Sequence, residues 1–305
     1  MATISVGGAL GEGFSLIRRH PGAVALWTAV LIGVLILRLA VSAPIYVALF
    51  SQMTHSIAGG GSASPDIAAV TPLIQQAQAL NLLLGLGSLA VNTVLICAVF
   101  RAVLHPEQSR FSYLRLGSAE VFLFIFMIAA FIAFAIAAVV AIIPVAIIIG
   151  VFAAGSPAAA IGLGVVAVLA LGVGAVYLAL RLSLIGPMMV DDGQLHLGDA
   201  WALTRGNVAA LFGMGLVLVV IIIVAELVIL GLGAALLGAA TGGFSQLKSL
   251  IQQGPQAILA ALGPALVFEF VAWIAFIGLV LPIFNAPWAR AYRDLKPTDV
   301  AATFS

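Results

Sequence analysis

Six long runs of apolar residues constrain this chain more than any other feature. They cover about residues 22–43, 80–100, 121–144, 158–180, 208–230 and 265–284. A helix needs about 20 consecutive apolar residues to cross the hydrocarbon core of a bilayer. With 64% of its 305 residues hydrophobic and only 8% charged, a soluble fold could not cover its surface with polar groups. The runs therefore predict an all-α integral membrane protein, with residues 1–305 forming a single six-span membrane domain.

The basic residues outside the spans lie almost entirely on one side. Ten of the 12 Lys and Arg residues flank the spans on the side that carries both ends of the chain. Lys248 alone lies on the other side, and Arg38 lies inside the first span. Because Lys and Arg are enriched in cytoplasmic loops, we expect a multi-pass protein of the bacterial inner (plasma) membrane with cytoplasmic N- and C-termini.

The connections expected outside the membrane differ in character. Residues 51–71 contain a Gly/Ser-rich stretch and no basic residue, which is typical of a flexible loop. Gly155-Ser156-Pro157 predicts a tight turn. Residues 244–251 place their apolar side chains on one helical face and predict a helix on the outer interface.

Three cytoplasmic segments share the order aromatic, small, any, any, Arg. Each precedes an odd-numbered span, and each even-numbered span ends near an Arg. This pattern predicts three hairpins with cytoplasmic interfacial helices, and we interpret the first and third copies as a duplication. In the middle copy, the general need for Arg and an aromatic residue at a cytoplasmic flank is the favoured explanation. The segments are residues 14–18, 111–115 and 201–205, and the closing residues are Arg101, Arg181 and Arg290.

Small residues recur every four positions in the third and fourth spans. Such ridges allow helix backbones to approach closely inside a bilayer. We expect tight packing along Ala129, Ala133, Ala137 and Ala141, and along Ala158, Gly162, Ala170 and Gly174.

The sequence offers little catalytic chemistry. Its four His residues are scattered over both sides of the membrane, and none is spaced with another ligand on one helical face. Residues 85–88 lack the pattern of a serine nucleophile, and residues 191–193 are interpreted as a solvated cytoplasmic turn. With a net charge of +1 there is no basic surface for nucleic acid. We therefore expect no catalytic residues, no metal and no cofactor.

Three charged residues lie within the spans: Arg38, Glu226 and Glu269. At about 1.5 Å per residue, all three fall in the outer third of a hydrocarbon core about 30 Å thick. An unpaired charge at that depth is costly, so we predict that Arg38 pairs with Glu226, Glu269 or both. The cluster could be a static lock or a proton- or ligand-linked site, and separate snorkelling to the surface is the alternative. Asn92 and Asn285 are expected to bridge helices.

One stretch resembles a known family. Trp201-Ala202-Leu203-Thr204-Arg205-Gly206-Asn207, with residues 181–187 before it, is similar to uncharacterised bacterial six-span proteins related to the glycerophosphodiester phosphodiesterase membrane domain, which include YciC-like proteins. The resemblance covers mainly residues 181–230, with a weaker echo at 10–40. In that family the membrane domain can be fused to a catalytic domain. We expect none here, since only 15 residues follow Arg290.

These observations favour a non-enzymatic multi-pass membrane protein, a helper or scaffold in envelope or lipid physiology. Its expected partners are membrane lipids, with no nucleic acid, and the sequence identifies no protein partner. The alternative is a small transporter with a polar site near Arg38, Glu226 and Glu269. A membrane-embedded hydrolase fits least, because no nucleophile–base pair can be named.

Overall fold

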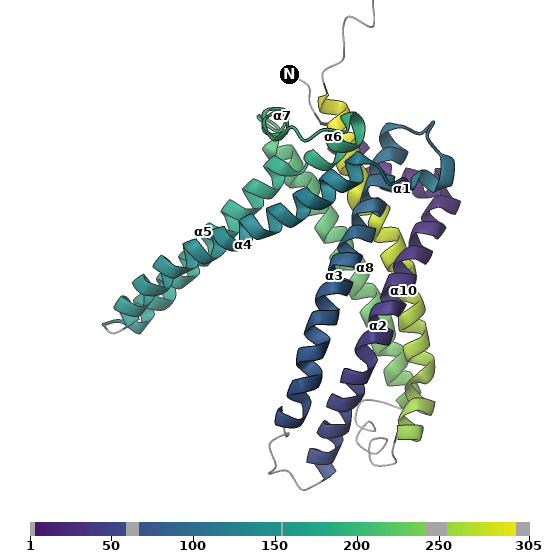
Figure 1. The fold of residues 1–305 in the computed structure, drawn as a ribbon, viewed down its shortest axis with the longest axis vertical. Helices are drawn as coiled ribbons and strands as arrows, with labels where there is room; N and C mark the ends of the chain where they lie inside the picture. The colour runs from purple at the N-terminus through teal and green to yellow at the C-terminus, as the bar shows by residue number, and fades with distance from the viewer. Residues whose placement is uncertain (1–3, 59–66, 154, 242–254, 297–305) are drawn as a thin grey trace, which may run out of the picture. The chain divides into compact units, whose positions relative to one another are not determined.

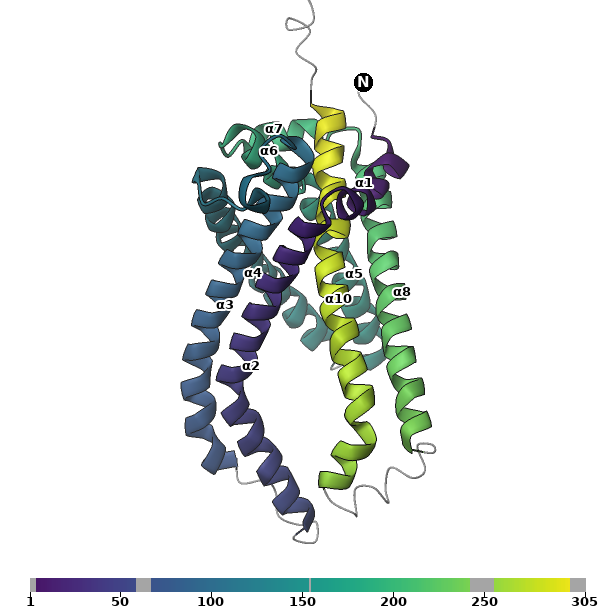
Figure 2. The same ribbon diagram turned by 90° about the vertical axis from the view of Figure 1, so that its right-hand side faces the viewer.

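The computed structural model describes residues 4–58, 67–153, 155–241 and 255–296, and the regular elements of these residues are all helices. Six of the helical segments are long and apolar enough to cross a membrane (Figures 1 and 2). The predicted fold class is thereby confirmed. In chain order the elements are α1 (Val6–Arg19), α2 (Pro21–Ala58), α3 (Ile67–Leu104), η1 (Arg110–Tyr113), α4 (Ser118–Ala153), α5 (Pro157–Leu182), α6 (Ile185–Asp192), α7 (Leu197–Leu203), α8 (Val208–Thr241) and α10 (Pro255–Leu295).

The helices extend well beyond the predicted spans. The first predicted span covers about residues 22–43, yet α2 continues through Pro44 to Ala58. Likewise, α4 continues through Pro144 to Ala153. Proline removes one helical hydrogen bond, but membrane helices tolerate it because neighbouring groups can satisfy the freed carbonyl. Neither proline therefore ends its helix.

The chain divides into two compact units. Unit 1 contains the residues up to Pro21, Ile96–Leu227 and the residues from Val280 onward. Unit 2 contains Gly22–Leu95 and Val228–Leu279. Helices α3, α8 and α10 each contribute one part to each unit. The single membrane domain expected over residues 1–305 stays a prediction.

Unit 1 has a hydrophobic core built from short and long helices together. The short helix α6 supplies Leu184 and Ile185 at its start and Met189 further along, all of them fully buried. Leu211 and Met214 of α8 complete the same cluster. Cys97 is also buried in it. The core is therefore concentrated where the spans end and the connecting segments pack against them.

Helix α1 is positioned by one close backbone contact. Ser5 caps it by accepting a hydrogen bond from the Gly8 amide at 3.3 Å. A Cβ atom added at Gly13 would lie 2.6 Å from the Cα atom of Ile283, so α1 crosses α10 with only a hydrogen atom between them (Figure 2). Phe14 on this helix is 46% exposed. Leu10 of the same helix is partly buried against the core and Leu16 is fully buried, so most apolar side chains of α1 face the protein.

Helices α4 and α5 form an antiparallel hairpin (Figure 1). In the most apolar 18-residue window of α4, 0% of the residues are buried within the chain. The tight turn is confirmed, since Ser156 caps α5 by accepting from the Ala159 amide at 3.4 Å. A surface of this kind is compatible with lipid and not with water.

The predicted small-residue ridges are wrong. Seven of the eight ridge residues are exposed, and Ala141 is half-buried. Contact with α4 instead involves the other side of α5, where a Cβ atom at Gly164 would lie 3.3 Å from Ile149. The four-residue spacing identified small residues, but it did not identify which side of each helix packs against the other. Small residues are abundant all around both helices. The less exposed residues of α5 include Ala160, Gly164, Ala167 and Ala175.

Two predicted connections lie outside the described residues. They are the Gly/Ser-rich part of the loop after the first span and the interfacial helix at 244–251.

The close crossing of α1 and α10 can be tested with two glycines on one helix. Gly13→Ala should lower the free energy of unfolding by about 1–3 kcal/mol, because its methyl group meets the backbone of Ile283 and Pro282. Gly11→Ala is the matched control, since a Cβ atom at Gly11 has nothing within 4 Å. It should leave stability unchanged or raise it by up to about 1 kcal/mol through helix propensity. Equal effects of the two substitutions in a denaturation assay in detergent would contradict the crossing.

Candidate functional site

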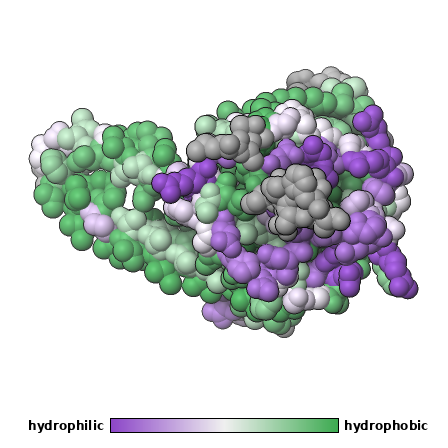
Figure 3. Space-filling model, turned by 90° about the horizontal axis from the view of Figure 1, so that it is seen from above, coloured by the Kyte–Doolittle hydropathy of each residue, from purple (hydrophilic) through white to green (hydrophobic). Residues whose placement is uncertain are grey.

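The three arginines that close the even-numbered spans each make polar contacts with another segment of unit 1. We call Arg101, Arg181 and Arg290 the closing arginines. Figure 3 shows hydrophilic side chains gathered on one face of unit 1, whereas hydrophobic side chains cover the α4–α5 hairpin. The closing arginines differ in their partners.

Arg101 lies at the end of α3 and is buried. Its guanidinium donates to the carbonyl of Tyr113 at 2.6 Å and pairs with the Glu120 carboxylate. The side chains of Arg101 and Glu120 are only 7% and 3% exposed. Glu120 also accepts from the Gly117 amide at 2.9 Å at the start of α4, where the helix dipole favours a negative charge. This pair joins the end of the first hairpin to the start of the second.

Arg181 lies near the end of α5 and contacts the segment before the third hairpin. Its guanidinium donates to the Trp201 carbonyl at 3.1 Å and to the Thr204 hydroxyl at 3.4 Å. It also donates to the Tyr177 hydroxyl at 2.9 and 3.0 Å. The guanidinium carbon lies 4.7 Å from the centre of the Trp201 ring, a cation–π distance.

Arg290 lies near the end of α10 and contacts the segment before the first hairpin. Its guanidinium is 3.6 Å from Glu12 of α1 and 3.0 Å from Asp294. Glu12 is 9% exposed and also pairs with Arg19, and with Arg293 at 3.7 Å. Arg293 in turn donates to the Val103 carbonyl of α3 at 3.2 Å.

The contacts of the closing arginines form a closed series. Arg101 contacts the segment that opens the second hairpin, Arg181 the segment that opens the third, and Arg290 the segment that opens the first. Each hairpin end is therefore tied to the next hairpin start. Such a series holds three hairpins together at one end, independently of lipid packing further along the helices.

Asp191 joins the same region from α6. Its carboxylate accepts from Tyr292 at 2.8 Å, pairs with Lys296, and lies 3.3 Å from the His105 ring. Its side chain is only 12% exposed. The interpretation of residues 191–193 as a solvated turn is therefore wrong for Asp191. Gly193, with φ of 74°, ends the helix as a glycine does after a C-cap.

The three repeat segments adopt different local structures. Phe14 lies on α1 and Trp201 on α7, and both are exposed, at 46% and 40%. The middle copy is not an α-helix, because Phe111, Ser112 and Tyr113 all have positive φ angles. That conformation is uncommon outside glycine. The separation of the middle copy from the other two agrees with the interpretation favoured from the sequence.

Arg38 lies in unit 2, where it lines a small cavity between α2 and α3. The cavity has a volume of about 330 Å³ and is also lined by Ser42 and Asn81, whose polar atoms lie 3.5 Å apart. Arg38 itself is exposed. The polar groups that line this cavity with Arg38 are therefore Ser42 and Asn81, and not the predicted carboxylates of Glu226 and Glu269.

Glu269 also lies in unit 2, packed against α8. A Cβ atom at Gly233 would overlap the Oε2 atom of Glu269, so Gly233 makes room for the carboxylate. That oxygen is buried and lacks a hydrogen-bond partner within the described part of the chain. No ion pair between Arg38 and Glu269 is recorded among the described residues. Glu226 is half-buried on the part of α8 that belongs to unit 1, and its pairing with Arg38 stays a prediction.

The two intramembrane asparagines bond their own helices. Asn92 donates to the Ser88 carbonyl at 3.0 Å, and Asn285 donates to the Leu281 carbonyl at 2.8 Å. Bridging of two helices was expected, whereas these two hydrogen bonds each lie within one helix. A polar side chain on a helix can satisfy itself four residues back when no partner helix presents an acceptor.

Comparison with known proteins adds no relative. No family model, no curated protein and no solved structure matches the chain. Within the described ranges, no group of three or more His, Cys, Asp or Glu residues could hold a metal ion. The structure thus defines the class of a multi-pass helical membrane protein, and its polar contacts define the candidate site.

Sequence reasoning missed the acidic partners of this site. It identified Arg101 and Arg290 but not Glu120 and Glu12, which they contact. One signal was available, because each acid lies in the short polar segment that precedes an odd-numbered span.

Removing Glu12 should destabilise the protein, because three arginines surround one nearly buried carboxylate. We expect Glu12→Gln to lower the free energy of unfolding by about 1–3 kcal/mol, an amount limited by the partial exposure of the arginines. Glu107→Gln is the matched control, since Glu107 is 66% exposed and only faces His105 at 3.5 Å. It should change stability by less than about 0.5 kcal/mol. Titration with sodium dodecyl sulfate in mixed micelles measures both, and a neutral Glu12→Gln would contradict the role of Glu12.

Proposed function

We propose that this protein is a non-enzymatic scaffold or helper in envelope or lipid physiology. In this proposal it is a multi-pass protein of the bacterial inner membrane with cytoplasmic termini. Its likeness to YciC-like six-span proteins belongs to the same proposal. The supporting observation is the closed series of contacts made by the closing arginines.

Charged groups near the ends of the spans are used to hold the chain together. Glu12, Glu120 and Asp191 each face basic side chains of another segment. Carboxylates that are matched in this way stabilise an arrangement of helices. They are less suited to proton transfer, which needs a group free to gain and lose a proton. This use of charge favours a structural role.

The large uncovered apolar surface supports the same proposal. Side chains such as Phe131 and Val151 of α4 are 73% and 69% exposed within the chain. A membrane-embedded hairpin of this kind offers a surface to lipids or to the helices of a partner. A scaffold requires such a surface in addition to a rigid end.

The second candidate is a small transporter, and the cavity beside Arg38 favours it. Arg38, Ser42 and Asn81 bring a cation, a hydroxyl and an amide to a space of about 330 Å³ inside a span region. Polar groups within membrane helices often mark a pathway for a substrate. A transport route needs further polar groups at other depths, which the sequence provides only sparsely.

Genetic complementation separates the two candidates. In cells that lack the gene and show a defect of envelope permeability, the scaffold predicts full rescue by a Ser42→Ala/Asn81→Leu variant that folds and accumulates normally. It also predicts loss of rescue by Arg101→Met, which breaks the contact between hairpins. Dye uptake by the cells measures the defect. Failure of the normally folded Ser42→Ala/Asn81→Leu variant to rescue would favour the transporter and contradict the scaffold.

A further inference from the structure

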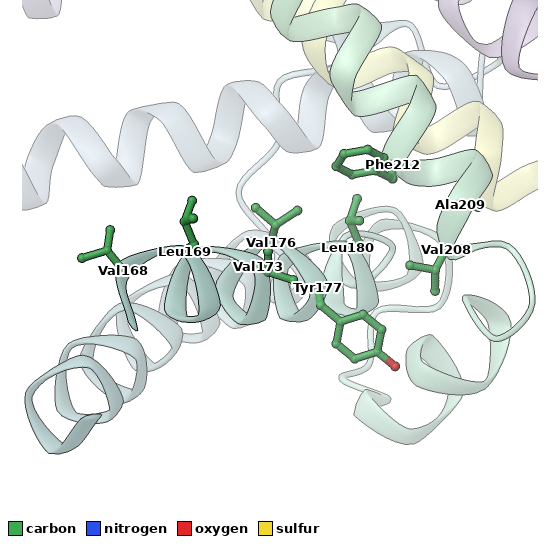
Figure 4. Close-up of a pocket in the computed structure, with 10 residues that line it drawn as sticks. Val168, Leu169, Val173, Val176, Tyr177, Leu180, Val208, Ala209 and Phe212 are labelled. Atoms are coloured by element: carbon green, nitrogen blue, oxygen red, sulfur yellow. The ribbon is translucent and has the colours of Figure 1, made fainter. Parts of the chain in front are cut away.

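An apolar groove lies between α5 and the first turns of α8 in unit 1. Figure 4 shows its side chains projecting from α5, between Val168 and Leu180, and from α8, between Val208 and Phe212. The groove has a volume of about 850 Å³, within the range of sites that hold small molecules. At 1.5 Å per residue, Val168 to Leu180 spans about 18 Å. This length is close to one leaflet of a hydrocarbon core about 30 Å thick.

One end of the groove is polar. Arg181 directly follows the groove residue Leu180, and the groove residue Tyr177 accepts two hydrogen bonds from the Arg181 guanidinium. The rings of Tyr177 and Trp201 meet edge to face at 6.2 Å, and both face Arg181. Tyr and Trp with an adjacent Arg are typical of the level of the lipid headgroups. The groove therefore runs from the interface into one leaflet.

Arg181 differs from the other closing arginines in its partners. Arg101 faces Glu120, and Arg290 faces Glu12. Among the ion pairs recorded for the described residues, none includes Arg181. Its hydrogen-bond partners are uncharged, and Asp199 on the neighbouring α7 instead lies 3.8 Å from His196. The positive charge of Arg181 is thus available to an anion.

The groups around Arg181 suit a phosphate in particular. A guanidinium has five N–H donors, and four hydrogen bonds of Arg181 go to Tyr177, Trp201 and Thr204, which leaves one Nη2 N–H for a phosphate oxygen. The Tyr177 oxygen accepts from Arg181 and still has its own O–H to donate. An acyl chain beside these donors would cover the apolar groove. A phospholipid combines both features in one molecule.

We propose that this groove binds an anionic phospholipid. One acyl chain lies along α5 between Val168 and Leu180, and the phosphate contacts Arg181 and Tyr177. The phosphate pairs with Arg181 as a carboxylate pairs with Arg101 and with Arg290. Charge complementarity favours this occupant over an apolar helix of a partner, which would leave Arg181 uncompensated. The proposal goes beyond the scaffolding role and holds for a transporter as well.

Lipid titrations of the full chain in maltoside micelles, followed by native mass spectrometry, test this site. The probes are phosphatidylglycerol, phosphatidylcholine with the same acyl chains, and glycerol phosphate. We expect phosphatidylglycerol to bind about tenfold more tightly than phosphatidylcholine, as one charge-assisted interaction allows. Arg181→Gln should reduce this preference to about twofold or less. Arg18→Gln, which removes an exposed charge on α1, should preserve it.

Two glycines of α5 test the groove without touching Arg181. Gly172 lines the groove, Gly174 does not, and a Cβ atom at either has nothing within 4 Å. Gly172→Phe should weaken phosphatidylglycerol binding about tenfold or more, because the ring fills the groove. Gly174→Phe has the same cost in helix geometry and should bind as the unsubstituted protein does. This pair decides the proposal even if Arg181→Gln fails to fold.

Three results would overturn the proposal. One is equal binding of phosphatidylglycerol and phosphatidylcholine by the unsubstituted protein. Another is an equal effect of Gly172→Phe and Gly174→Phe. The third is binding of glycerol phosphate as tight as that of phosphatidylglycerol, which would mean that the site recognises the free phosphate and not the lipid.

Discussion

The contact between a closing arginine and the next hairpin is the interaction on which the arrangement of unit 1 depends. Apolar surface gives little drive for helices to associate in lipid, because the surrounding acyl chains are equally apolar. Polar contacts that lipid cannot supply must therefore determine which helix ends meet. Arg101 with Glu120 is the most buried of these contacts, at 7% and 3% exposure. Its burial makes the pairing specific, since neither charge can be left without its partner.

The same contacts explain the distribution of packing. Fully buried side chains such as Leu184 and Met214 lie where short segments pack against the ends of spans. Further along α4 the side chains are exposed within the chain. A protein in a bilayer can leave such side chains to lipid, whereas a soluble protein could not. The structure thus combines a polar, packed end with long apolar helices.

Sequence reasoning predicted the spans because membrane thickness sets their length. It also located Arg101, Arg181 and Arg290 at the ends of even-numbered spans. It could not predict which acid each arginine contacts, because Arg290 and Glu12 are far apart in the chain and meet only through tertiary structure. The small-residue ridges failed for a related reason. Composition identifies small residues, but the contact side of α5, including Gly164, follows from how the hairpin closes.

The intramembrane charges illustrate a further difficulty. Depth along a helix can be estimated from residue number, but the direction of a side chain depends on the rotation of each helix. Arg38 lies beside Ser42 and Asn81, and Glu269 lies against Gly233. Arithmetic on helix rise places a group at a level in the membrane. It does not determine which neighbour the group faces at that level.

A double-mutant cycle on Arg101 and Glu120 tests the central claim most directly. Arg101→Met and Glu120→Met should each lower the free energy of unfolding by about 3–5 kcal/mol, because each leaves a buried charge unpaired. The double variant should lose less than the sum of the two by at least about 1.5 kcal/mol, since it buries no unpaired charge. Sodium dodecyl sulfate titration in mixed micelles measures all three. Additive losses within about 0.5 kcal/mol would contradict the claim that this contact ties the first hairpin to the second.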